Sequence, residues 1–210
     1  FMSIMGLSMV LLPMFSLSHK YSEKFINIGF YGMISSIAGF EASIDFKWLR
    51  VLFFTLVLVS IGLYLAQVYE IYKHKPKGRD DIYIKGMFYS HIFIFFAVVG
   101  LLYSPVMFGI LMFLGFLQMF ITSNLYKIVP FLVWFHRFSP LVGKKRVPML
   151  GDMLKKELSL AHIGLYLTGL FLLIVSLAFN MKSLYTIACV LLFLGATAFL
   201  VNMFYVLSLK

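Results

Sequence analysis

Long, largely uncharged hydrophobic stretches recur from the first residue of this chain to the last. Seven of them are close to the 20 or so apolar residues that a helix needs to cross the hydrocarbon core of a bilayer, which is about 30 Å thick. We predict an all-α, polytopic transmembrane bundle, because the stretches are continuous and do not alternate as barrel strands do. The expected spans are residues 1–18, 25–42, 48–70, 84–103, 105–126, 158–180 and 183–208.

The charge content supports this prediction. Only 12% of the 210 residues are charged and 62% are hydrophobic, whereas soluble domains average about a quarter charged and half apolar residues. We therefore expect one transmembrane domain over residues 1–210, in the inner (cytoplasmic) membrane of a bacterium. The formal net charge of +10 does not indicate a nucleic-acid partner, because the basic residues lie beside the hydrophobic stretches.

Basic residues are distributed unequally between the two sides of the predicted bundle. If the seven spans alternate in direction, fifteen Lys and Arg residues lie on one side and only Lys47, Arg50 and Lys182 lie on the other. Cytoplasmic connections are enriched in Lys and Arg, so we expect the N-terminal end outside and the C-terminus in the cytoplasm. The basic-rich side holds Lys20, Lys24, Lys73, Lys75, Lys77, Arg79, Lys85, Lys127, Arg137, Lys144, Lys145, Arg146, Lys155, Lys156 and Lys210.

The connection over residues 127–157 is rich in both aromatic and basic residues. We expect this loop to lie along the membrane interface, with Trp134 at the depth of the lipid headgroups. The cations Arg137, Lys144, Lys145 and Arg146 are then placed to contact anionic lipids of the cytoplasmic leaflet.

Small residues form a stripe along the second predicted span. Gly29, Gly32, Ser36, Gly39 and Ser43 follow one another at spacings of three and four, so they share one helix face. Such a stripe lets another helix approach closely, and we favour this packing role over a ligand site. We expect five amides to face protein rather than lipid, most of them through hydrogen bonds between helices: Asn27, Gln67, Gln118, Asn124 and Asn202.

Two histidines, His91 and His162, fall inside predicted spans at a similar distance from the cytoplasmic side. Two neutral imidazoles on neighbouring helices can be the axial ligands of a b-type haem, which gives one hypothesis for this pair. The alternative is that both are packing histidines that form hydrogen bonds near the interface. We identify no catalytic residue, because the sequence has no phosphate loop, dinucleotide fingerprint, HExxH motif or paired carboxylates.

Three blocks of sequence resemble a known group of bacterial membrane proteins. They are Met5–Ser8, Leu12–His19 and Leu125–Trp134, the last followed by Gly143-Lys144 and Val147–Leu150. These blocks are similar to subunit I of haem-copper oxidases and to the NnrS-type haem-copper proteins linked to nitric oxide. The resemblance implies that the chain is the C-terminal half of a longer, roughly twelve-helix protein.

The resemblance also implies haem b and a place in respiratory electron transport or nitric-oxide chemistry. Copper is not expected, because the adjacent histidine pair and His-x-His pattern of the oxidases are absent and Asn124 stands where a histidine is expected. We therefore expect a haem-copper-oxidase-like subunit that either binds haem or is a degenerate accessory copy among other membrane subunits. Two alternatives remain, namely a non-catalytic scaffold and a transporter or channel for a small solute.

Overall fold

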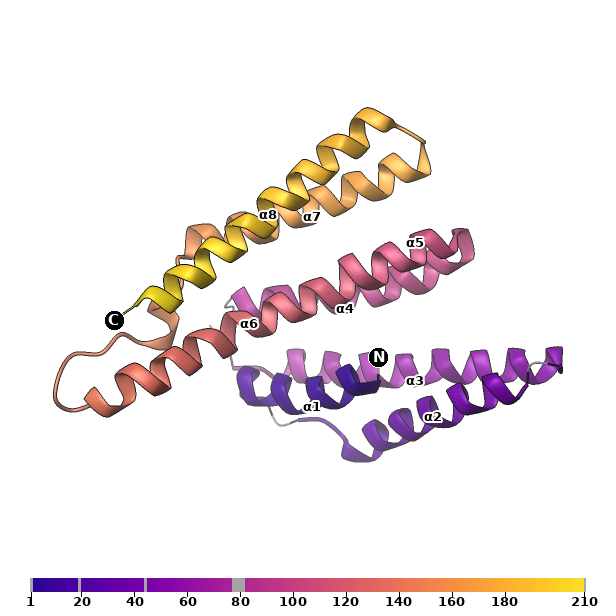
Figure 1. The fold of residues 1–210 in the computed structure, drawn as a ribbon. Coiled ribbons are helices and arrows are strands. Elements are labelled where there is room, and N and C mark those ends of the chain that lie inside the picture. Colours follow the sequence, from indigo (N-terminus) through magenta and orange to yellow (C-terminus); the bar gives the residue numbers. More distant parts are fainter. Residues whose placement is uncertain (1, 19, 44, 77–81, 210) are drawn as a thin grey trace. The chain divides into compact units, whose positions relative to one another are not determined.

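The computed structural model describes residues 2–18, 20–43, 45–76 and 82–209. In these ranges the chain forms helices and connecting segments and no β-strand (Figure 1). An all-helical fold was predicted from the continuous apolar stretches. The chain divides into two compact units, residues 1–79 (unit 1) and 80–210 (unit 2), which are described separately.

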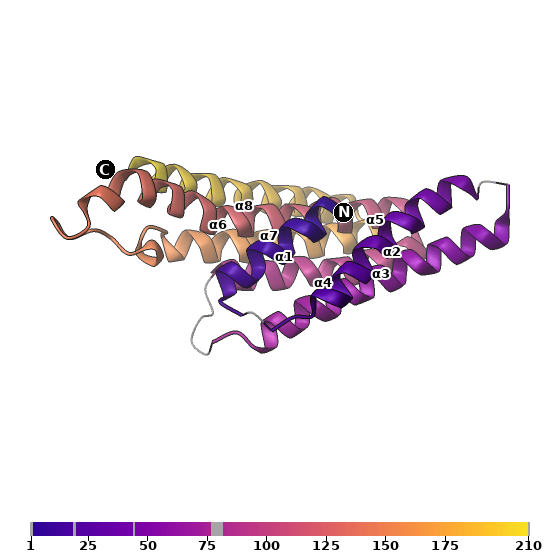
Figure 2. The ribbon, with the colours of Figure 1, turned by 90° about the horizontal axis from the view of Figure 1, so that it is seen from below.

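Unit 1 contains three helices, α1 (Met2–Ser16), α2 (Glu23–Ala42) and α3 (Lys47–Lys73). Helices α2 and α3 form an antiparallel pair (Figure 2). Helix α1 contacts α3 through a hydrogen bond of 2.9 Å between the hydroxyls of Ser8 and Tyr64, both buried. This polar contact joins the short first helix to the longest helix of the unit.

Unit 2 contains a helical hairpin followed by a second hairpin. Its elements are α4 (Ile82–Tyr103), α5 (Pro105–Ile110), the π-helical η1 (Leu111–Leu117), α6 (Gln118–Val133), the π-helical η2 (Trp134–Phe138), the 3₁₀ turns η3 (Ser139–Leu141) and η4 (Leu150–Asp152), α7 (Lys156–Ala178) and α8 (Lys182–Ser208). The predicted break before Pro105 is present, and Ser104 caps α5 by accepting a hydrogen bond of 3.2 Å from the Val106 amide.

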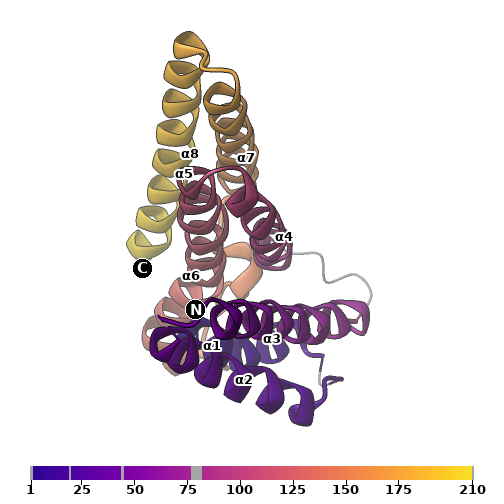
Figure 3. The same ribbon diagram turned by 90° about the vertical axis from the view of Figure 1, so that its right-hand side faces the viewer.

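Helices α7 and α8 lie side by side along most of their length (Figure 3). Gly169 and Gly195 permit this approach, because a Cβ at either position would lie 3.0–3.3 Å from backbone atoms of the facing helix. The two hairpins of unit 2 place four helix termini at the same end: the start of α4, the end of η3, the start of α7 and the end of α8 (Figure 1). We call this the basic end of unit 2, and the opposite end, at Ser104 and Phe179–Met181, the turn end.

Within the part of the chain that the structure describes, five helices are long and apolar enough to cross a membrane. They are Lys47–Lys73, Ile82–Tyr103, the continuous helix Pro105–Leu141, Lys156–Ala178 and Lys182–Ser208. These five indicate an integral membrane protein. The first predicted span forms a 15-residue helix, Met2–Ser16, and the second has charged residues at its ends and several Gly and Ser residues that make α2 less apolar. Neither is among the five.

The helix that begins at Pro105 continues well beyond residue 126, where the sequence analysis ended the fifth span. It has 37 residues, so it is about 55 Å long at 1.5 Å per residue, against about 30 Å for the hydrocarbon core. Its last part, with Trp134 and Arg137, is helical, where the sequence analysis expected a loop over 127–157. The connection is residues 142–155, which are irregular apart from the 3₁₀ turn η4. Lys77, Arg79 and Lys210, which the charge count included, lie outside the described residues.

Candidate functional site

His91 lies on α4 and is only 5% exposed. Its Nδ1 atom is 2.6 Å from the backbone oxygen of Met87, one turn earlier on the same helix. The imidazole packs edge-to-face against Phe116 and Phe120, with ring centroids 6.2 and 6.3 Å away. His91 is thus enclosed by aromatic rings from the helix that pairs with α4.

His162 lies on α7 and is 1% exposed. Its Nδ1 atom is 3.0 Å from the hydroxyl of Tyr126 on α6, which links the two hairpins of unit 2. The rings of Tyr126, Tyr166 and Phe199 surround the imidazole at centroid distances of 5.2–5.8 Å. His162 therefore sits where α6, α7 and α8 meet.

The two histidines have different aromatic neighbours. Each imidazole packs against rings from neighbouring helices. Among the described residues, no group of three or more His, Cys, Asp or Glu side chains is placed to hold a metal ion.

Asn202 on α8 clamps the first turn of α7. Its side-chain oxygen accepts a hydrogen bond of 3.1 Å from the Lys155 amide, and its side-chain nitrogen donates to the Lys155 carbonyl at 3.0 Å and to the Ser159 hydroxyl at 2.8 Å. Asn202 is fully buried. This amide joins helices, as the sequence analysis expected of the buried amides.

The aromatic and basic residues of segment 127–157 have two different environments. Trp134 is half-buried and donates a hydrogen bond of 2.9 Å to the Pro148 carbonyl, and Arg137 donates to the carbonyls of Leu207 (2.8 Å) and Leu209 at the end of α8. Lys144, Lys145 and Arg146 are exposed on the connection. Trp134 and Arg137 thus stabilise the fold at the basic end, and the other three cations are available to a partner.

The small-residue stripe of α2 faces α3. A Cβ at Gly29 would lie 3.5 Å from the Ser60 carbonyl, a Cβ at Gly32 would lie 2.8 Å from the Ser60 hydroxyl, and a Cβ at Gly39 would collide with the Phe53 ring. Ser36 is fully buried and donates its hydroxyl to the Gly32 carbonyl within α2. The stripe is a helix-packing surface.

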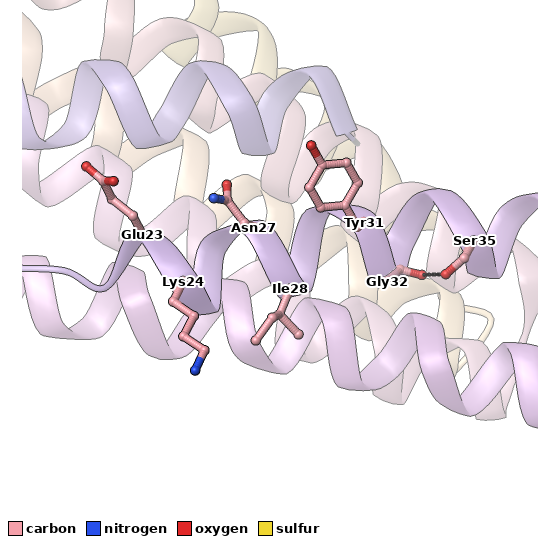
Figure 4. A pocket seen from close by; sticks show the side chains of 7 residues that line it. All are labelled: Glu23, Lys24, Asn27, Ile28, Tyr31, Gly32 and Ser35. Carbon is pink, nitrogen blue, oxygen red and sulfur yellow. Dashed lines mark hydrogen bonds between the residues drawn. The ribbon is translucent and has the colours of Figure 1, made fainter.

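A shallow hollow on α2 begins beside this stripe (Figure 4). All seven lining residues, Glu23, Lys24, Asn27, Ile28, Tyr31, Gly32 and Ser35, belong to the same helix. Ser35 donates a hydrogen bond of 3.0 Å to the Gly32 carbonyl, and Tyr31 is 68% exposed. Because a single helix lines it, the hollow does not enclose a ligand.

A deeper groove, which the sequence analysis did not anticipate, lies in unit 2 between α4, the start of the 105–141 helix and α7. Its volume is about 520 Å³, and its lining is apolar apart from the Tyr103 hydroxyl. Its lining residues are apolar side chains from three helices. The sequence alone does not show that these side chains meet, because that depends on how the three helices pack.

Comparison with known proteins assigns no family. No family model matches this chain. Searches of curated proteins and of solved structures also give no match. The function is therefore inferred from the residues and the geometry described above.

Proposed function

We propose that this chain is an accessory subunit of a respiratory membrane assembly in the bacterial inner membrane, built like subunit I of the haem-copper oxidases but serving to hold helices together. The observation that carries this proposal is the use of the polar side chains of unit 2. His162 bonds Tyr126, Asn202 bonds Lys155, and His91 packs between phenylalanine rings. Each of these side chains connects one helix to another.

The proposed topology has seven membrane crossings, with α1 and α2 added to the five long helices. The support is the charge at the helix ends. In unit 2, eight described Lys and Arg residues lie toward the basic end and only Lys182 lies at the turn end. In unit 1, Lys20, Lys24, Lys73 and Lys75 lie at one end, and Lys47 and Arg50 lie at the other. Both richer ends then face the cytoplasm.

Anionic lipids of the cytoplasmic leaflet are the proposed partners of the exposed cations. Lys144, Lys145 and Arg146 are consecutive, and no acidic residue lies within five positions of them on either side in the sequence. Each cation near an anionic surface contributes about 1 kcal/mol of attraction. This interaction would hold the 142–155 connection against the membrane.

A second candidate function is redox chemistry with a b-type haem at His91 and His162. It is favoured by the contact between His91 Nδ1 and the Met87 carbonyl, since a partner on one imidazole nitrogen fixes the orientation of the ring for a metal at the other.

One experiment separates these candidates. The protein is purified in mild detergent from its native membrane and examined by native electrophoresis and visible spectroscopy, beside His91→Ala and His162→Ala variants. The accessory proposal predicts co-migration with other membrane subunits and no Soret band that depends on these histidines. A Soret band present in the wild type and lost in both variants would favour the haem candidate. A protein that migrates without other subunits and carries no haem would contradict both candidate functions.

A further inference from the structure

One segment of the helix over residues 105–141 is wider than the rest. In the π-helical η1, the backbone hydrogen bonds join residues five apart instead of four, which makes room for one extra residue. At the end of this wide turn, the Gln118 amide donates to the Phe113 carbonyl. In a regular α-helix the same amide would donate to the Leu114 carbonyl. The Leu114 carbonyl therefore loses the amide that would bond it in an α-helix.

Tyr166 on α7 supplies a donor for this carbonyl. Its hydroxyl donates a hydrogen bond of 3.0 Å to the Leu114 oxygen, and the Tyr166 side chain is buried. A backbone carbonyl without a donor is unfavourable where water is excluded. If the wide turn moved along the helix, a different carbonyl would lose its amide, and the Tyr166 hydroxyl would not reach it. Tyr166 therefore stabilises the wide turn at this one position.

The position of the wide turn decides which side chains face α4. Leu111 and Phe116 both do. A Cβ on Gly100 of α4 would lie 2.9 Å from Leu111 Cδ1, and Phe116 packs edge-to-face against His91 of α4. In an α-helix, residues five apart lie about 140° apart around the axis, so they cannot both face one neighbouring helix. In a π-helix they lie nearly in line, because the hydrogen bonds join residues five apart.

We propose that Tyr166 is a latch that keeps Phe116 over His91. Without the Tyr166 hydroxyl, the wide turn is no longer held and moves toward α6, which has 16 residues to receive it, whereas α5 has only 6. The residues that the wide turn leaves behind then become α-helical. Leu111 stays against α4, and Phe116 rotates away from it. His91 loses one of the two phenylalanine rings that enclose it and becomes accessible to small molecules.

The test is the chemical reactivity of His91 in the purified full chain. Diethyl pyrocarbonate, a small reagent that acylates neutral imidazole, is added to the protein in detergent micelles, and the modification of His91 is followed by peptide mass spectrometry. We expect His91 to react at least fivefold faster in Tyr166→Phe than in the wild type. Tyr126→Phe is the matched control, because it removes a hydrogen bond of the same 3.0 Å length between the same two long helices. In this control His91 should react at the wild-type rate.

Deletion of Phe113 gives a rescue that a merely structural role of Tyr166 would not show. Phe113 is 67% exposed, and the removal of one residue lets the helix close into a regular α-helix. Leu111 and Phe116 are then four positions apart and both still face α4. The Tyr166 hydroxyl is no longer needed. Tyr166→Phe in the deleted chain should therefore leave the reactivity of His91 and the thermal midpoint unchanged.

Several results would overturn the proposal. One is an equal reactivity of His91 in the wild type and in a folded Tyr166→Phe variant, and another is an equal rise in Tyr126→Phe. If Tyr166→Phe does not fold in the complete chain, the deleted chain decides, because the same substitution should fold there. A chain lacking Phe113 that does not fold, or in which Tyr166→Phe still prevents folding or raises the reactivity of His91, would also overturn it.

Discussion

The α2–α3 pair of unit 1 and the α7–α8 pair of unit 2 both pack through glycine, but their glycines face different groups. Gly32 and Gly39 of α2 face the side chains of Ser60 and Phe53, which can adjust. Gly169 and Gly195 face the backbone of the opposite helix, which cannot move without separating the helices. The comparison shows that a visible stripe of glycines does not identify the tighter interface.

The pairs also differ in polar contacts. Asn202 forms three hydrogen bonds between α8 and the start of α7. In the α2 stripe, the hydroxyl of Ser36 bonds within its own helix. We therefore expect substitutions in α7–α8 to reduce stability more than matched substitutions in α2–α3.

The largest effect is expected for Gly195→Ala. The added methyl would lie 3.1 Å from the Tyr166 amide nitrogen and 3.3 Å from the His162 carbonyl, and overpacking against rigid atoms costs typically 1–3 kcal/mol. We expect a loss of about 2 kcal/mol in the free energy of unfolding, measured by denaturant titration in detergent micelles. Gly164→Ala is the control, because nothing lies within 4 Å of its Cβ, and it should be neutral or slightly stabilising.

Asn202→Leu should be nearly as damaging. The substitution replaces the amide with a branched apolar group, so the Lys155 amide loses its side-chain partner and the Lys155 carbonyl keeps only its bonds from Ser159. Each lost polar contact in a membrane helix pair is worth about 0.6–1.7 kcal/mol. We expect a total loss of about 1.5–2 kcal/mol in the same titration. An unchanged stability would mean that water replaces Asn202 and that the clamp contributes nothing.

Gly32→Ala should cost less, about 0.5–1 kcal/mol, because only the Ser60 hydroxyl obstructs the new methyl. Adding Ser60→Ala removes that obstruction, so the double variant should recover most of the loss. If Gly32→Ala lowered the free energy of unfolding as much as Gly195→Ala and the double variant recovered none of that loss, the α2–α3 pair would be no more tolerant than the α7–α8 pair.

The smallest effect is expected for Arg137→Gln. Its guanidinium donates to carbonyls at the end of α8, but the residue is exposed, and a cation at an exposed helix C-terminus contributes about 0.3–1 kcal/mol. The control is Lys144→Gln, which removes an exposed cation on the 142–155 connection. The thermal midpoint of each variant is measured against that of the wild type. Only the midpoint of Arg137→Gln should fall.

The helical fold could be predicted from the sequence because apolar stretches of span length have few other solutions in a membrane. The break before Pro105 followed from proline chemistry alone. The continuation of that helix past residue 126 could not be predicted from the sequence, because the segment around Trp134 and Arg137 has the composition of an interfacial loop. In the structure this segment is helical, and its side chains bond the Pro148 carbonyl and the end of α8.

For the candidate site, the sequence predicted which residues are involved but not which residues they contact. His91, His162 and Asn202 were identified as polar residues inside spans, but their partners lie up to 47 positions away or come from ring packing. Sequence spacing carries no information on such contacts. Asn27 is exposed on α2, where it lines a pocket with Met9 of α1 and Tyr64 of α3.

Cysteine accessibility tests most directly whether the Lys-rich end of unit 1, which holds Lys73 and Lys75, and the basic end of unit 2 face the same side of the membrane. In a Cys189→Ser background, single cysteines at Lys75, Lys145 and Met181 are labelled with a membrane-impermeant maleimide in intact cells and after permeabilisation. We predict that Lys75→Cys and Lys145→Cys react only after permeabilisation and that Met181→Cys reacts in intact cells. Labelling of positions 75 and 145 from opposite sides of the membrane would contradict the proposed topology and the side on which the basic ends lie.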